Sequence, residues 1–94
     1  MIITFKKKQL EDFFYDGKNK GINPQHIHKV SRILDRLHSS KAIKDMNFPG
    51  SNLHLLEPKK DKRWAVNISG NWRITFIWND NDNDAYDVNY TDYH

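Results

Sequence analysis

The chain has 94 residues, enough for one domain spanning residues 1–94 but too few for a two-domain cofactor enzyme. It contains no cysteine, which excludes a disulfide framework and thiolate zinc sites and fits a reducing compartment. The formal net charge of +3 is unevenly distributed, with +6 over residues 1–44, +2 over residues 45–73 and −5 over residues 74–94. A basic half fits a phosphate-backbone partner, although solubility alone explains mild basicity equally well.

The first elements are predicted to be a short strand and a helix. Residues 2–5 are apolar but too few for a signal peptide or a membrane span, so we expect a strand there, a cytoplasmic protein and no membrane partner. Residues 7–16 place Leu10, Phe13 and Phe14 on one helical face, and Gly17 is a fitting end.

A second helix is predicted to begin at Asn23 and Pro24, because asparagine caps a helix and proline suits its first position. Lys29, Arg32 and Arg36 lie off its apolar stripe and should be solvated; phosphate binding by the two arginines is the less favoured interpretation. The stripe keeps i, i+3, i+4 and i+7 spacing and consists of Ile27, Val30, Ile33, Leu34 and Leu37.

The second half of the chain reads as strands. A short turn is expected around residues 42–46 and another at Pro49-Gly50, followed by strands over residues 53–57, 63–68, 72–78 and 85–90. Short connections favour successive hairpins. The predicted fold class is α+β, with two N-terminal helices packed on one face of a mostly antiparallel twisted sheet.

The strand over residues 72–78 organises the prediction. At period two it carries tryptophan, isoleucine, phenylalanine and tryptophan on one side, which predicts a core face. Its other side carries Arg73, Thr75 and Ile77. Side chains alternate between the two faces along the strand predicted for His54, so the His54 side chain can lie on the uncovered face together with that of Arg73.

The acidic run over residues 79–84 has the first three spacings of an EF-hand calcium loop in Asp80, Asp82 and Asp84. The sixth position is Ala85 rather than glycine, the twelfth is Thr91 rather than glutamate, and the flanks are strands. A solvated hairpin loop is the better interpretation.

A set of proton-transfer and phosphate-binding groups remains: His54, Arg73 and the chain end Asp92-Tyr93-His94. Cleavage of RNA through its own 2′-hydroxyl needs a base, a cation and an acid, which Asp, Arg and His supply without metal, while Tyr can stack on a base. Each also has a plain interpretation: a surface histidine, an arginine paired with an aspartate such as Asp87, and a fraying terminus.

Four segments, residues 52–56, 63–66, 69–76 and 90–94, closely resemble the HigB toxins of the RelE/ParE superfamily, as does Phe48-Pro49-Gly50 before the histidine strand. The resemblance implies a RelE-like fold and a ribosome-dependent mRNA endonuclease that cuts message in the ribosomal A site. It also implies a HigA-type antitoxin with a helix-turn-helix domain, and contact with operator DNA only through that complex. It implies no cofactor and no metal.

The resemblance also implies roles for individual residues. His54 and His94 would be acid/base or transition-state groups, Asp92 a base or an orienter of histidine, Arg73 the holder of the scissile phosphate and Tyr93 the positioner of the nucleotide. Related toxins often carry a lysine after the histidine strand, where this chain has Glu57-Pro58 first. RNA or ribosome contacts are expected at Lys6, Lys7, Lys8, Lys18, Lys20, Arg32, Arg36, Lys59 and Lys60.

Two other functions stay open from the sequence. One is a non-enzymatic inhibitor of DNA gyrase, as in ParE toxins, although such an inhibitor has no need of the histidine, arginine and terminal acid set. The other is a weakly active domain that serves to bind its antitoxin.

Overall fold

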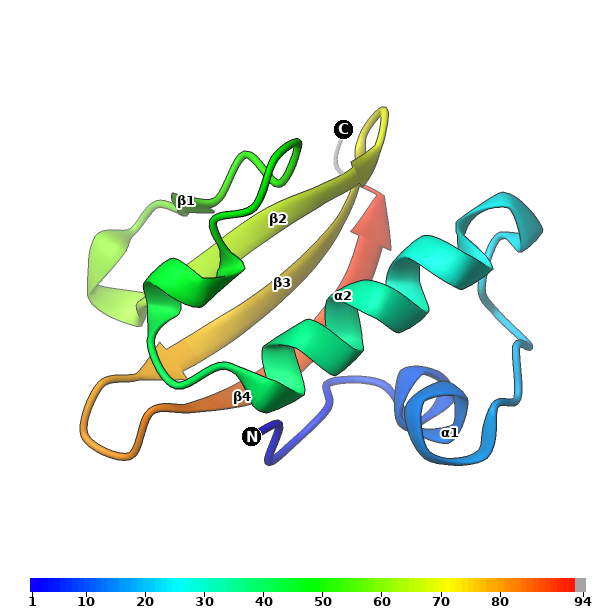
Figure 1. The fold of residues 1–94 in the computed structure, drawn as a ribbon, viewed down its shortest axis with the longest axis horizontal. Helices are drawn as coiled ribbons and strands as arrows, with labels where there is room; N and C mark the ends of the chain where they lie inside the picture. The colour runs from blue at the N-terminus through cyan, green and yellow to red at the C-terminus, as the bar shows by residue number, and fades with distance from the viewer. Residues whose placement is uncertain (93–94) are drawn as a thin grey trace.

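The computed structural model describes residues 1–92 and confirms the α+β class. Its sheet is antiparallel throughout, with strands in the order β1-β2-β3-β4, as successive hairpins require. Figure 1 shows the arrangement. The elements are α1 (Lys8–Asp16), η1 (Pro24–His26), α2 (Ile27–Ser39), η2 (Ile43–Met46), β1 (His54–Leu55), η3 (Lys59–Asp61), β2 (Arg63–Ser69), β3 (Trp72–Asn79) and β4 (Asp84–Asp92).

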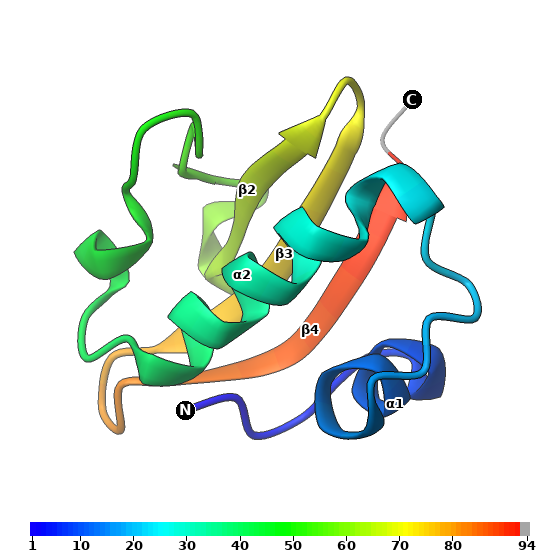
Figure 2. The same cartoon turned by 45° about the vertical axis from the view of Figure 1, so that its right-hand side comes forward.

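Helix α2 covers one side of the sheet, and α1 adds Leu10 and Phe13 to the same core cluster from a position beyond β4 (Figures 1 and 2). Helix α2 runs diagonally across β2, β3 and β4, and α1 lies beside the N-terminal segment (Figures 1 and 2). The predicted apolar face of β3 is confirmed, because Ile74, Phe76 and Trp78 are buried in the same core cluster as the stripe of α2. Each large side chain removed from water contributes about 1.5–3 kcal/mol, so this layer supplies the main stabilisation of the fold.

The helix ends follow their local sequence. Gly17 adopts a left-handed conformation with φ of 72°, and its N–H donates to the Phe13 carbonyl at 3.0 Å, which ends α1. The Asn23 side chain accepts from the Gln25 N–H at 3.0 Å, which caps the start at Pro24. The first turn there is 3-10, and the α-helical geometry begins at Ile27.

The predicted first strand is wrong as a regular element. Residues 2–5 run parallel to β4 but form isolated bridges, Ile2 with Ala85 and Phe5 with Val88. The cause is a bulge in β4 at Asp87, which has a φ of 54° and donates its N–H to the Thr4 side chain instead of to a ladder carbonyl.

The strand predicted over residues 53–57 is shorter than expected, since β1 contains only His54 and Leu55. Asn52 before it is left-handed, with φ of 46°, and Pro58 after it has no N–H to donate. The Leu56 N–H still pairs with the Arg63 carbonyl at 2.8 Å. The pairing of these two residues with β2 is therefore enough to fix the position of His54.

The second sheet face is less open than predicted. Ala65, Thr75 and Asn89 on this face are all buried, with at most 8% of their surface exposed. Arg63 lies across it and donates from Nη1 to Thr75 Oγ1 at 3.0 Å, so a long polar side chain does the covering rather than a helix. Within residues 1–92, no helix is long and apolar enough to cross a membrane.

Candidate active site

The prediction that His54 and Arg73 share one face of the sheet is confirmed. His54 pairs with Ala65 across β1 and β2, while Arg73 pairs with Asn67 across β3 and β2. Residues on alternate positions of a strand share a face, so both side chains stand on the face opposite the helices. Arg73 Nη1 lies 3.5 Å from His54 Nε2.

The backbone before β1 sets the orientation of the His54 ring. His54 Nδ1 lies 2.8 Å from the Asn52 carbonyl oxygen, which can only accept, so Nδ1 carries the proton. In the neutral ring, Nε2 then presents its lone pair toward Arg73. A neutral imidazole with this tautomer can take up a proton at Nε2, beside a permanently charged guanidinium.

A second arginine occupies the other end of the same face. Arg63 donates to Thr75, to the Asp87 carbonyl at 3.2 Å and to the Asp87 carboxylate. The bulge that interrupts β4 turns the Asp87 side chain toward Arg63. The alternative interpretation, in which Arg73 forms an ion pair with Asp87, is therefore wrong, because Asp87 is paired with Arg63 instead.

The structure places Asp92 at the end of β4, but not on the face of Arg73. Asp92 pairs with Trp72, whereas Thr91 pairs with Arg73. Cross-strand partners point to the same side, so Asp92 stands with Trp72 and Tyr90 on the helix side at the rim of the sheet. Tyr93 and His94, the other predicted residues of the chain end, lie outside the described residues.

Beside Asp92 lies an aromatic cluster that the sequence did not single out. Tyr90 stacks on Trp72 with ring centroids 4.6 Å apart, and its hydroxyl lies 2.7 Å from Nδ1 of the buried His26. Burial raises the pKa of Tyr90, a hydrogen bond from the Asn23 N–H lowers it, and the negative charge of Asp92 raises it further. His26 falls in a polar run of the sequence, which gave no signal that it would be buried.

Two asparagines, one half-buried and one buried, stand on the face of Arg73. The side-chain oxygens of Asn67 and Asn89 are buried and have no hydrogen-bond partner among the described residues. Asn67 lies directly opposite Arg73, and its own N–H donates to the Ser51 carbonyl at 2.8 Å. Asn67 was not predicted as a site residue, although its alternation with Arg63 in the strand sequence indicated the face.

The basic residues predicted to contact RNA are all exposed. They do not form one patch: those of η3 lie at the β1 edge of the sheet, whereas those of α1 lie on the β4 side (Figures 1 and 2). Lys8 is partly occupied by an ion pair with Asp12 at 3.3 Å. The predicted basic residues therefore lie in separate groups, and the group on α2 is the one that borders a groove.

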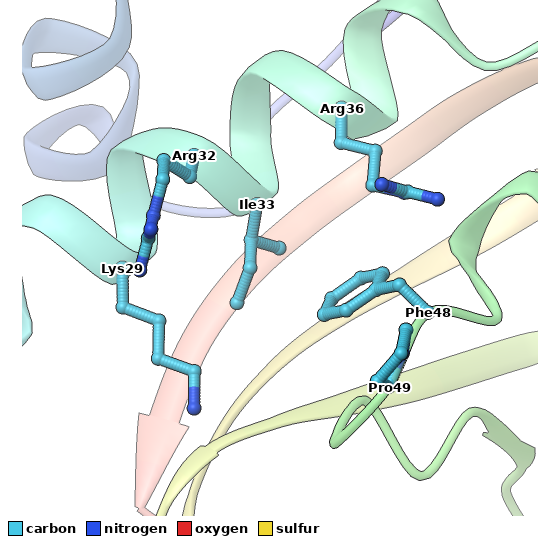
Figure 3. Close-up of a pocket in the computed structure, with 6 residues that line it drawn as sticks. All are labelled: Lys29, Arg32, Ile33, Arg36, Phe48 and Pro49. Atoms are coloured by element: carbon cyan, nitrogen blue, oxygen red, sulfur yellow. The ribbon is translucent and has the colours of Figure 1, made fainter.

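On α2, three cations border a groove of about 340 Å³ whose lining is shown in Figure 3: Lys29, Arg32, Ile33, Arg36, Phe48 and Pro49. Arg36 donates from Nε to the Asp45 carbonyl at 2.8 Å, and its guanidinium lies 4.9 Å from the Phe48 ring centroid. Arg32 and Arg36 are both exposed, as predicted, and Arg36 in addition has these two partners.

Lys29, by contrast, is not solvated as predicted. It is half-buried, and its Nζ donates to the Ile68 carbonyl at 2.5 Å. The register of β2 and β3 shifts between Asn67 and Ser69, which takes Ile68 out of the ladder and leaves its carbonyl for the lysine.

The acidic loop between β3 and β4 behaves as the hairpin loop that was predicted. Asp80 pairs with Lys62 at 3.6 Å, Asp84 pairs with the N-terminal ammonium at 3.0 Å, and Asp82 accepts from the Tyr86 hydroxyl at 2.6 Å. Over residues 1–92, no group of three or more histidine, cysteine or acidic side chains is arranged to hold a metal ion.

A helical layer on one side and a histidine–arginine pair on the other define a small α+β protein with its polar chemistry on one sheet face. The model of a protein family described as "RelE-like toxin of type II toxin-antitoxin system HigB" matches residues 3–94. The chain belongs to this HigB-like toxin family, which confirms the resemblance. A toxin of a type II system has an antitoxin as its partner.

Individual relatives agree with the family. The chain is similar to "Endoribonuclease HigB" of Proteus vulgaris, with 33% identity over 94 residues and all of both chains covered. It is similar to "Toxin HigB-1" of Vibrio cholerae serotype O1, with 29% identity over 82 residues, 85% of this chain and 86% of the relative. An uncharacterised protein of Haemophilus influenzae is 31% identical over 80 residues, which cover 83% of this chain and 79% of that protein.

Proposed function

We propose that this toxin is an endoribonuclease that cuts messenger RNA in the A site of the ribosome and so stops translation and growth. The observation that carries the proposal is the His54–Arg73 pair, in which a lone pair of the imidazole and a guanidinium stand 3.5 Å apart on one sheet face. The name of the Proteus vulgaris relative, "Endoribonuclease HigB", supports the endoribonuclease part of this proposal.

The pair suits cleavage of RNA by its own 2′-hydroxyl. A base removes the 2′-hydroxyl proton, the 2′-oxygen bonds to phosphorus, and the bond from phosphorus to the 5′-oxygen breaks as an acid supplies that oxygen with a proton. Arg73 stabilises the charge that builds on the phosphoryl oxygens. His54 at Nε2 fits the base or the acid, and this chemistry needs no metal ion.

The chain end is included in the proposed site on the strength of the family resemblance, although the register of β3 and β4 places the Asp92 side chain on the opposite face from that of Arg73. Asp92 stands at the rim of the sheet, one residue past the partner of Arg73, and the chain continues from it directly into Tyr93 and His94. By the family resemblance, Asp92 acts as base or orienter, Tyr93 stacks on the nucleotide and His94 exchanges a proton. Several ionisable groups acting together titrate as a set, so the pair and the chain end share the acid and base work.

The ribosome would contribute the substrate geometry, and basic side chains would hold its RNA. The groove of α2 is the best formed of these surfaces, because Lys29, Arg32 and Arg36 line one side of it without an acidic neighbour in the lining. Lys6, Lys7, Lys8, Lys18, Lys20, Lys59 and Lys60 would add weaker contacts from separate places, as exposed lysines do.

The proposed partner in the absence of RNA is an antitoxin of the HigA type with a helix-turn-helix domain. Contact with operator DNA would then come through the complex and not through the toxin alone. Co-expression and pull-down with the product of the neighbouring reading frame tests this, and a toxin that purifies alone under those conditions would count against it.

The test of the main proposal is to map cleavage of a defined message on programmed ribosomes. Wild type should cut within the A-site codon, and Arg73→Ala should cut at least about 10²-fold more slowly, because one donor to a developing oxyanion contributes that much. His54→Gln, with His28→Gln as the control for an exposed histidine on α2, should separate acid or base work from general effects. Naked RNA is the control for ribosome dependence.

The opposite result is equally informative. If the message stays intact while the protein still stops growth, the nuclease proposal fails, and a gyrase supercoiling assay becomes the next measurement. If Arg73→Ala cuts as fast as wild type and is equally toxic, the cleavage belongs to other residues.

A further inference from the structure

Tyr90 carries a hydroxyl that the hydrophobic core does not need. Tyr90 is 6% exposed as a residue, and its ring stacks on Trp72, which is packing that a phenylalanine would provide equally well. The hydroxyl is nonetheless provided with two polar partners: the Asn23 N–H donates to it at 3.3 Å, and Nδ1 of His26 lies 2.7 Å away. Since the oxygen accepts from Asn23, its own proton can be donated to His26.

Both partners belong to the start of the second helical segment. Asn23 is the N-cap of η1 and His26 is the last residue of η1, where it is 5% exposed and packs edge-on against Trp72 at 5.6 Å. The end of β4 is therefore attached by a side-chain hydroxyl to a rigid helix start. A buried hydroxyl with matched partners holds a defined position, because leaving any of the three groups unpaired costs free energy.

The attachment lies immediately before Asp92. Tyr90 and Asp92 are two residues apart in one strand, so they share a face, and Asp92 lies opposite Trp72. The charge of Asp92 contributes to the raised pKa of Tyr90, which agrees with their closeness. The N-terminal segment pairs with β4 only as far as Val88, where the Lys6 N–H donates to the Val88 carbonyl at 2.9 Å.

We propose that the Tyr90 hydroxyl, held between the Asn23 N–H and His26, is a positioning group that fixes the end of β4 and so places Asp92 for cleavage. The inference rests on the proposed nuclease function and deepens it. Tyr90 and His26 touch no substrate; they act through the strand. Misplacement of a reacting group by about 1 Å can lower the rate up to about 10²-fold, so a single hydroxyl that positions the end of a strand can have a measurable effect on the cleavage rate.

The test compares Tyr90→Phe with Tyr86→Phe. Both substitutions remove one hydroxyl from β4, but that of Tyr86 bonds to Asp82 in the acidic loop at the far end of the strand. In single-turnover cleavage on programmed ribosomes, Tyr90→Phe should slow the cut about tenfold at saturating toxin without changing its affinity for ribosomes. Tyr86→Phe should cleave as wild type does.

A double-mutant cycle separates positioning from stability. If Tyr90 acts through Asp92, then Tyr90→Phe should add less than about twofold to the loss already caused by Asp92→Asn. An equal loss in both backgrounds would mean that the hydroxyl only stabilises the fold and would overturn the proposal. Cleavage by Tyr90→Phe at the wild-type rate would overturn it as well.

His26 supplies an independent check should Tyr90→Phe fold poorly. His26→Leu removes the partner of the hydroxyl and should reproduce the slow cut. His26→Asn keeps an acceptor near the place of Nδ1 and should restore at least part of the rate. Equal rates for the two variants would contradict the proposal. If wild type itself leaves the message intact, the nuclease function and the positioning role fail together, a result distinct from failure of the variants alone.

Discussion

Arg63 and Arg73 stand on the same face of the same sheet and have different surroundings. Arg63 is bound to Thr75 and, through both the carbonyl and the carboxylate, to Asp87. Arg73 has the Nε2 of His54 at 3.5 Å and lies at the end of the sheet where β4 reaches Asp92. The first arrangement ties β2 to β3 and to the bulge of β4, whereas the second gathers groups that can move a proton and hold a phosphate. Residue type alone did not separate these two roles.

The assignment of a structural role to Arg63 and a catalytic role to Arg73 would be wrong if Arg63 were also needed for cleavage. Arg63→Ala leaves Asp87 and the buried Thr75 hydroxyl without their donor, so we expect the free energy of unfolding to fall by about 1–2 kcal/mol, since the carboxylate is partly solvated. Cleavage per folded molecule should stay close to that of wild type. Urea denaturation and single-turnover cleavage, run beside Arg73→Ala, measure both. A rate loss for Arg63→Ala as large as that for Arg73→Ala would show one continuous site.

A smaller change tests the same division from the side of the acceptor. Thr75→Val keeps the shape of a side chain that is 5% exposed but removes the oxygen that accepts from Arg63. The free energy of unfolding should fall by about 1 kcal/mol, the net value of one hydrogen bond. Chemical denaturation gives this number. An accompanying loss of cleavage would mean that packing around Thr75, at the centre of this sheet face, also affects the geometry of the site at His54.

A third arginine extends the comparison to the opposite face. Arg32 borders the α2 groove and is exposed, so Arg32→Gln should leave both folding and the cleavage step unchanged. We expect it to weaken ribosome binding slightly for every codon and to reduce the salt slope of binding by about 1, as loss of one phosphate contact does. Lys41→Gln, an equal charge change at an exposed residue outside that groove, is the control. Equal salt slopes for the two variants would remove the groove from the RNA contacts.

The sequence predicted the elements that depend on local chemistry. Gly17 ended the first helix, Asn23 and Pro24 began the next helical segment, and the period-two pattern of β3 gave the buried face correctly. It did not predict that residues 2–5 would form isolated bridges, because the bulge that prevents a regular strand lies more than eighty residues away in β4. Long-range pairing leaves no periodic signal in the segment that it disrupts.

The candidate site divides in the same way. The residue types and the alternation of the strands were sufficient to bring His54 and Arg73 to one face. The choice between Arg63 and Arg73 as the partner of Asp87 was decided by the bulge, which turns the carboxylate toward Arg63. The side of the sheet on which Asp92 stands was decided by the register of β3 and β4, because a shift of one residue moves a side chain to the other face.

By itself, the sequence determined the α+β class, the helix boundaries to within a turn, the core face of the central strand and the set of groups available for chemistry. These follow from backbone preference and hydrophobic period, which act over a few residues. Only the tertiary structure decided that His26 is buried next to Tyr90 and that the Lys29 ammonium donates a hydrogen bond to a carbonyl of β2. The physical reason is that polar partners are chosen in space, once burial has removed water as the alternative.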